Sequence, residues 1–283
     1  MAGEHVPTTG LTLRGVAHHV QDTDSALAAD PMLRTYLTDL AATHGLAPRP
    51  ELMDTGQAYA ELAAPAVTAV TTPGEPVDLL VLAYAVPDVQ PGRSVAVHLA
   101  SLCPGLPLAF AICDQGAAAA FTALRLIADF GATRAVLVVA EQAAVPYPLV
   151  AQAPVPDRHS AVALLLESDD GPASVRTRTG LSPDAVEAAL AEDVAALRGT
   201  RDDVTLVLGP GLDGAGSGLP YTGMWARLAH GEPGSLLVFA DHDPGLGYLC
   251  VAALEHSPRP AGLVAAADSP GVRGGVANMA VKD

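Results

Sequence analysis

The sequence predicts an α/β protein in which helices cover the faces of buried sheets. Val77–Val86 is a near-continuous apolar run flanked by Pro and Asp, which is typical of a strand buried on both faces. Residues 115–130 instead keep their apolar side chains on one face at helical spacing. Segments of these two kinds alternate along the chain, and such alternation predicts layers of sheet and helix.

The N-terminal part begins with a predicted strand and two predicted helices. Leu11–Val20 alternates apolar and polar residues as a half-buried strand does. Residues 21–33 are predicted to open a helix, and residues 32–46 carry apolar side chains at helical spacing, with Gly45 as the stop. Residues 48–76 form a helical or irregular connection that closes with a Pro-Gly turn.

The central stretch predicts a strand, a turn and a helix around one cysteine. Leu108–Ile112 is a short apolar strand, and Cys113 follows it directly. Gln115–Phe130 is predicted to be a helix that ends at Gly131, and a second buried strand then runs to Ala140. Cys113 is therefore expected where a strand passes into a helix.

The rest of the chain repeats the alternation in a shorter form. Residues 144–156 contain four prolines and predict a loop that borders a pocket. The elements predicted after it are strands at 157–168 and 175–180, a helix at 185–197 that starts with Ser182 and Pro183, a strand with a Gly-rich loop at 202–223, and a closing hairpin at 234–255.

Cys113 is the candidate nucleophile. The first turn of a helix has unpaired N–H groups and partial positive charge, which lower the pKa of a nearby thiol. A thiolate attacks acyl groups, and Gly116 with the alanines after it leaves room for a substrate arm. The alternative is that Cys113 packs as a small hydrophobic residue in the core. Asp114, directly after it, would raise the thiol pKa by like charge or orient a neighbour.

Composition excludes several classes of function. The formal net charge of −16 disfavours binding to nucleic acids and anionic membranes. The sequence contains neither a membrane-spanning apolar run nor a signal peptide, so we expect a soluble cytoplasmic protein. Three cysteines without CxxC spacing indicate free thiols and no zinc site. No nicotinamide, flavin or other cofactor motif is present.

Four stretches, in order, resemble one known family. The segment AICDQGAAAAFTALRLIADFGATRAVLVVAE is similar to the nucleophile segment of the thiolase superfamily, in particular its ketoacyl-carrier-protein synthase III branch. The other three stretches that resemble the family are VDLLVLAYAVPDVQPGRSVAVHLA before this segment, and DRHSAVALLLE and GSLLVFADHDPGLGYLCVAALE after it.

The resemblance implies a thiolase-like layered αβαβα fold made of two similar halves. The halves would span residues 1–170 and 171–283 and form one compact unit, with the second half shortened. Members of the family take acyl groups from the phosphopantetheine arm of an acyl carrier protein or from coenzyme A. Their usual homodimer joins the sheets through the strand before the nucleophile. An acidic carrier protein would need a local basic patch, and most of the arginines that could supply one are expected to be ordinary solvated side chains. These arginines are Arg125, Arg134, Arg176, Arg178, Arg198 and Arg201.

Two catalytic groups of the family are missing from this sequence. The family histidine would fall at Gly209, Pro210 or Gly211, and the family asparagine would fall within residues 215–217, which contain none. Both groups serve the enolate in decarboxylative C–C condensation, so the resemblance leaves that reaction in question.

A replacement for the missing base is predicted in the closing hairpin. Asp241, His242 and Asp243 align with the family loop that reaches the nucleophile. A histidine oriented by a carboxylate can act as a general base for acyl transfer. The alternative is a turn whose Asp and Pro serve only the backbone.

The remaining candidates contact substrate or fill the core. The predicted substrate-binding residues are His159, Gly116 and Gly245, and His159 is also the second choice of base. His98 is expected to be packed or at the surface, and Cys250 to be in the core.

Three functions from different classes follow. The first is an acyltransferase of specialised metabolism, such as antibiotic biosynthesis, that forms a thioester on Cys113 and passes the acyl group to a hydroxyl or amine of a small molecule. The second is a condensing enzyme with an unusual base. The third is a degenerate, non-catalytic partner subunit of a ketosynthase.

Overall fold

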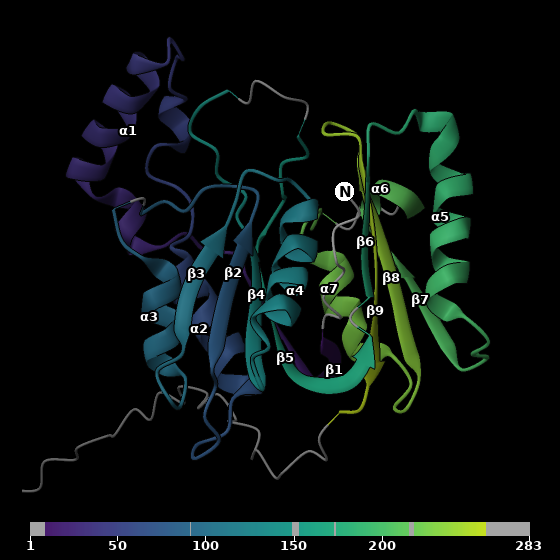
Figure 1. Cartoon of the computed structure of the whole chain (residues 1–283). Helices are drawn as coiled ribbons and strands as arrows, with labels where there is room; N and C mark the ends of the chain where they lie inside the picture. Colours follow the sequence, from purple (N-terminus) through teal and green to yellow (C-terminus); the bar gives the residue numbers. More distant parts are fainter. Residues whose placement is uncertain (1–8, 91, 149–152, 173, 215–217, 259–283) are drawn as a thin grey trace, which may run out of the picture.

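The computed structural model describes residues 9–258 except 91, 149–152, 173 and 215–217. In Figure 1 the layers follow one another from left to right, beginning with α2 (Tyr59–Val70) and α3 (Val95–Leu102). Next come the first half of the sheet and then the central helices α4 (Ala118–Phe130) and α7 (Gly223–Arg227). The second half of the sheet and α5 (Pro183–Arg198) follow. This arrangement confirms the predicted αβαβα layers.

The first half contains five strands in the order β3-β2-β4-β5-β1. β2, β3 and β4 are parallel, whereas β5 is antiparallel to both β4 and β1. The apolar runs of β2 and β4 are buried along almost their whole length, as strands covered on both faces require. The bounds are β1 (Thr9–Gln21), β2 (Leu79–Tyr84), β3 (Leu108–Ile112), β4 (Arg134–Glu141) and β5 (His159–Pro172).

The second half repeats this topology with one strand fewer. β9 is antiparallel to β8 and β6, as β5 is to β4 and β1, and β7 is parallel to β8, as β2 is to β4. Among the described residues no strand corresponds to β3, so β7 is the edge. The prediction of a shortened second half is thus confirmed. Its strands are β6 (Ser174–Thr179), β7 (Val204–Leu208), β8 (Leu236–Asp243) and β9 (Tyr248–His256).

The two halves share one core around the central helices. Phe121 of α4, Trp225 of α7 and Phe239 of β8 are fully buried and pack ring against ring, with centroids 5.2 to 5.8 Å apart. Burying three large rings excludes much apolar surface from water, which favours a single packed unit. The predicted boundary at residues 170 and 171 falls within β5 and stays a prediction.

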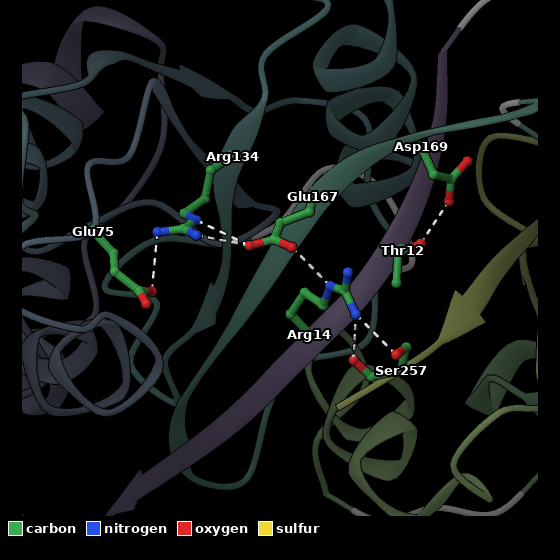
Figure 2. Close-up of polar contacts among 7 residues, drawn as sticks. All are labelled: Thr12, Arg14, Glu75, Arg134, Glu167, Asp169 and Ser257. Carbon is green, nitrogen blue, oxygen red and sulfur yellow. Dashed lines mark hydrogen bonds and ion pairs between the residues drawn. The ribbon is translucent and has the colours of Figure 1, made fainter. Parts of the chain in front are cut away.

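A line of charged side chains crosses the strands β4, β5 and β1 of the first half (Figure 2). Glu167 of β5 accepts hydrogen bonds from Arg14 of β1 at 2.8 Å and from Arg134 of β4 at 2.9 and 3.1 Å. Arg134 also reaches Glu75, and Arg14 reaches Ser257, which follows β9. The line therefore links both halves.

The helices near the N-terminus differ from the prediction. β1 extends to Gln21, and a short 3-10 helix, η1 (Ala26–Ala29), precedes α1 (Pro31–Thr43). Asp30 caps α1 and Pro31 is its first residue, so the new helix begins there. The remaining short helices are η2 (Pro50–Leu52), α6 (Pro210–Asp213) and η3 (Leu228–His230). In the part of the chain described, no helix has both the length and the apolar character to cross a membrane.

Candidate active site

Cys113 lies directly after β3, where the chain turns toward α4. Its side chain is half-buried, whereas Cys103 and Cys250 are both buried. The Cys113 thiol donates a hydrogen bond to Oδ2 of Asp114 at 3.1 Å and is also hydrogen-bonded by the hydroxyl of Tyr84, the last residue of β2. The sulfur is thus placed among polar groups, and not in a dry core.

The helix after Cys113 begins later than predicted. α4 starts at Ala118 instead of Gln115, because Asp114 (φ 62°) and Gly116 (φ 51°) adopt left-handed backbone conformations that an α-helix cannot contain. The expectation that a helix terminus lowers the pKa of Cys113 is therefore wrong. Burial raises the pKa of this thiol, and the hydrogen bond and charge of Asp114 raise it further, while the Tyr84 hydroxyl lowers it.

Asp243 occupies the amino end of α4. Its Oδ2 accepts a hydrogen bond from the Ala117 N–H at 3.1 Å, and its Oδ1 accepts one from the Leu246 N–H at 3.0 Å. A Cβ at Gly116 would overlap this carboxylate, so the approach of the hairpin to the Cys113 turn depends on a glycine there. The positive end of the helix is thus paired with a carboxylate of the protein itself.

Strand alternation separates the three polar residues of the hairpin. Asp241 pairs with Cys250, which belongs to the core around α4, whereas His242 pairs with Leu249, which packs on the α5 side. Successive side chains of a strand point to opposite faces, so Asp241 and Asp243 face α4 and His242 faces away. Nε2 of His242 is buried without a hydrogen-bond partner among the described residues. The structure therefore joins the Asp243 carboxylate to the Cys113 turn and directs the imidazole of His242 to the opposite face of the sheet.

Asp241 fills the region in which the family histidine was expected. It is buried, and its Oδ1 accepts hydrogen bonds from the backbone N–H groups of Gly211 at 3.0 Å and His242 at 2.9 Å. A Cβ at Gly209 would overlap its carboxylate, and one at Gly211 would overlap the carbonyl oxygen of His242. Neither position has room for a larger side chain. Burial raises the pKa of Asp241 to about 7.

A pocket of about 420 Å³ lies between the hairpin and the start of α4. This volume is within the range of small-molecule sites, about 300–1,000 Å³. Ala117 and Tyr221 of its wall also line a much smaller space that includes Tyr84 and Gly116, so the pocket approaches the Cys113 turn. The described lining consists of Ala117, Ala153, Pro154, Pro210, Gly211, Pro220, Tyr221, Asp241, His242, Asp243 and Pro244.

Glu141 holds one wall of this pocket in place. The side chain is fully buried at the end of β4 and accepts hydrogen bonds from the N–H groups of Tyr221 at 2.9 Å and Thr222 at 3.1 Å. The Thr222 hydroxyl also donates to it. Burial raises the pKa of Glu141 to about 7, and these hydrogen bonds lower it only in part.

The other predicted residues lie away from Cys113 or play structural parts. His159 is buried at the start of β5, where its Nδ1 accepts a hydrogen bond from the Ala143 N–H at 3.3 Å. Its Nε2 lies 3.5 Å from Oδ1 of Asp24, and burial lowers the pKa of the imidazole. Gly245 is exposed in the turn between β8 and β9, and His98 is exposed on α3. Cys250 is buried as expected. Residues 215–217, where the family asparagine would fall, lie outside the described residues.

Sequence reasoning missed Tyr84, Glu141 and Tyr221. Tyr84 is the one hydroxyl-bearing residue in the apolar run Val77–Val86, and Glu141 follows directly after the six apolar residues 135–140. A polar side chain at the carboxyl end of a buried strand was therefore the available signal. Tyr221 follows a Gly-rich loop and carried no such signal.

The comparisons with known proteins find similarity in structure and none in sequence. No family model matches the sequence, and no match is found among the curated proteins. Among solved structures, the chain is similar to ChlB3, titled an acyltransferase, with 16% identity, a TM-score of 0.57 and coverage of 88% of this chain and 98% of that one. It is also similar to the 3-oxoacyl-(acyl carrier protein) synthase III of Pseudomonas aeruginosa PAO1, with 16% identity, a TM-score of 0.57 and coverage of 88% of this chain and 99% of that one. A third similar structure is the tetronic acid condensing enzyme AbyA1, with 18% identity, a TM-score of 0.54 and coverage of 87% of this chain and 99% of that one.

These similarities show the fold. The chain has the thiolase-like fold of the synthase III proteins, as the resemblance predicted. At such low identity the likeness does not carry over a reaction or a set of catalytic residues.

Proposed function

We propose that the protein is an acyltransferase of specialised metabolism. Cys113 takes an acyl group from a coenzyme A thioester, or from the phosphopantetheine thioester of an acyl carrier protein, and passes it to a hydroxyl or amine of a small acceptor. One observation carries the proposal. A half-buried cysteine follows the last residue of a parallel strand, and Ala117, at the end of the turn after it, lines a pocket whose wall also contains Asp241 and Asp243.

The proposed chemistry needs a thiolate, a base and donors for the oxyanion. The Tyr84 hydroxyl stabilises the thiolate of Cys113 in this scheme. Asp241 is the base that takes the proton of the acceptor, since a carboxyl with a pKa of about 7 exchanges protons readily near neutral pH. The N–H groups of the turn after Cys113 receive the oxyanion. His242, predicted as base from the sequence, remains a candidate only if the hairpin rearranges.

The test is acyl loading followed by intact mass spectrometry. The protein is incubated with a panel of acyl-coenzyme A and acyl-carrier-protein donors, and any adduct is mapped to a peptide. We expect an adduct on Cys113 that is absent from Cys113→Ala and retained in Cys103→Ala, whose buried thiol serves as the control. An adduct that persists in Cys113→Ala, or none with any donor, would overturn the proposal.

A condensing reaction is the second candidate, because the chain shares its fold with a condensing enzyme. The close packing at Gly209 and Gly211 leaves no space there for the histidine that such a reaction needs. Release of carbon dioxide from malonyl-carrier protein would decide for condensation, since simple acyl transfer releases none.

We also propose a homodimer joined through β3. This strand pairs only with β2 among the described strands, and its residue Leu108 is 57% exposed. The ring of Phe110, in the same strand, packs against the exposed ring of Phe130 of α4, with ring centroids 5.7 Å apart. An apolar edge strand of this kind favours pairing with another strand. Light scattering should give a dimer for the protein and a monomer for Leu108→Lys.

A further inference from the structure

We infer that the acceptor is a primary amine with an apolar body, which enters the pocket as its ammonium ion and binds against Asp241 and Asp243. This inference rests on the proposed function, because it names the substrate class of the same site.

The charge of the pocket wall favours a cation. Besides Tyr221, the ionisable residues in its described lining are Asp241, Asp243 and His242, with no lysine or arginine. Both carboxylates face α4, so they act on the same space. An ammonium ion is attracted by the Asp243 carboxylate and by Asp241 in its ionised form, whereas an alcohol gains far less and a carboxylate or phosphate is repelled. The net charge of −16 also favours the approach of cations.

The two carboxylates keep free acceptor capacity. Each oxygen of a carboxylate has two lone-pair sites. The described hydrogen bonds of Asp243 use one site on each oxygen, and both described bonds of Asp241 go to Oδ1. These backbone bonds fix the carboxylates in position, so an ammonium group can bind to them without breaking existing contacts.

The rest of the wall suits an apolar body. Apart from the polar residues, the lining consists of alanines, a glycine and the four prolines Pro154, Pro210, Pro220 and Pro244, with the Tyr221 ring beside them. Rigid apolar walls with few polar groups at one end favour a ligand that has one polar end.

The transfer step balances without a further reactant. The ammonium ion first gives one proton to the carboxylate of Asp241, and the nitrogen lone pair then forms a C–N bond to the thioester carbon on Cys113. The C–S bond breaks and its electron pair stays on sulfur. The second proton leaves the nitrogen for the thiolate, so thioester and amine become amide and thiol.

The first experiment measures binding without acyl loading. Benzylamine and benzyl alcohol differ in charge at pH 7 but little in size, and phenylacetate supplies an anion. We expect Cys113→Ala protein to bind benzylamine about tenfold more tightly than benzyl alcohol in calorimetry or ligand-observed NMR. Phenylacetate should bind more weakly than both.

Charge-neutral variants locate the effect. Asp241→Asn and Asp243→Asn should each weaken benzylamine binding and leave benzyl alcohol binding unchanged, which also shows that the pocket is intact. Asp202→Asn, which removes a charge from a side chain that is 97% exposed, is the control for net charge and should change neither. Equal binding of the amine and the alcohol, or amine binding insensitive to both variants, would overturn the inference.

The second experiment separates this inference from the proposed function. Acyl-loaded protein is chased with benzylamine or benzyl alcohol, and loss of the adduct and formation of amide or ester are followed by mass spectrometry. Faster chase by the amine supports the inference, and equal or faster chase by the alcohol contradicts it. Failure of Cys113 to load would refute the proposed function, while the binding experiment would still decide the charge preference of the pocket.

Discussion

The carboxylate of Asp114 accepts a hydrogen bond from the thiol of Cys113 at 3.1 Å, between residues adjacent in the chain. This bond stabilises the protonated thiol, and the charge of the carboxylate disfavours the thiolate, so Asp114 raises the pKa of its neighbour. Asp114→Asn should lower that pKa. We expect faster alkylation of Cys113 by iodoacetamide at pH 7, and slower or unchanged alkylation would contradict the assignment.

Tyr84→Phe should act in the opposite direction. It removes the hydroxyl that stabilises the thiolate but keeps the ring that stacks on Tyr59, with centroids 5.6 Å apart. The pKa of Cys113 should rise and alkylation at pH 7 should slow. A pH profile of the alkylation rate measures the shift, and a profile identical to that of the unmodified protein would show that Tyr84 does not act on Cys113.

Gly116→Ala should destabilise the protein more than Gly131→Ala. Both glycines have a left-handed backbone, with φ 51° and φ 63°, where alanine costs about 1–2 kcal/mol. A Cβ at Gly116 would also overlap the Asp243 carboxylate, whereas one at Gly131 would meet nothing within 4 Å. Urea unfolding should show the larger loss for Gly116→Ala, and equal losses would mean that the hairpin moves freely.

Glu141 should make the protein less stable as the pH rises. Burial raises the pKa of its carboxyl to about 7 in the folded protein, against an ordinary value of 4.5. Between these values the unfolded chain is ionised and the folded protein is not, so rising pH favours unfolding by on the order of 3 kcal/mol in total. The free energy of unfolding of Glu141→Gln should fall less between pH 4.5 and 7, and an unchanged slope would contradict the assignment.

Glu167→Gln should destabilise the junction drawn in Figure 2. Glu167 neutralises Arg14 and Arg134, and the Arg134 side chain is only 18% exposed. Loss of the charge should cost about 1–3 kcal/mol in urea unfolding. Asp202→Asn breaks the exposed pair with Arg198 and should cost under about 0.5 kcal/mol. Similar values for the two variants would show that the charged line through Glu167 adds no stability.

The layered fold could be predicted from short stretches of sequence. Val77–Val86 contains β2, and the predicted helix at 185–197 lies within α5, because apolar periodicity reflects which faces are buried. The start of α4 could not be predicted, since the left-handed backbone at Asp114 places a tight turn where spacing alone favoured a helix.

The sequence by itself determined the two-half α/β fold, the position of Cys113 at the end of a strand, and a cluster of polar residues at 241–243. Tertiary structure alone decided which of these residues face one another. Asp243 meets Ala117 across 126 positions in the chain, and strand alternation turns His242 away from the carboxylates on either side of it. The physical reason is that hydrophobic periodicity acts over a few residues, whereas the surroundings of a thiol or a carboxylate depend on packing between segments far apart in sequence.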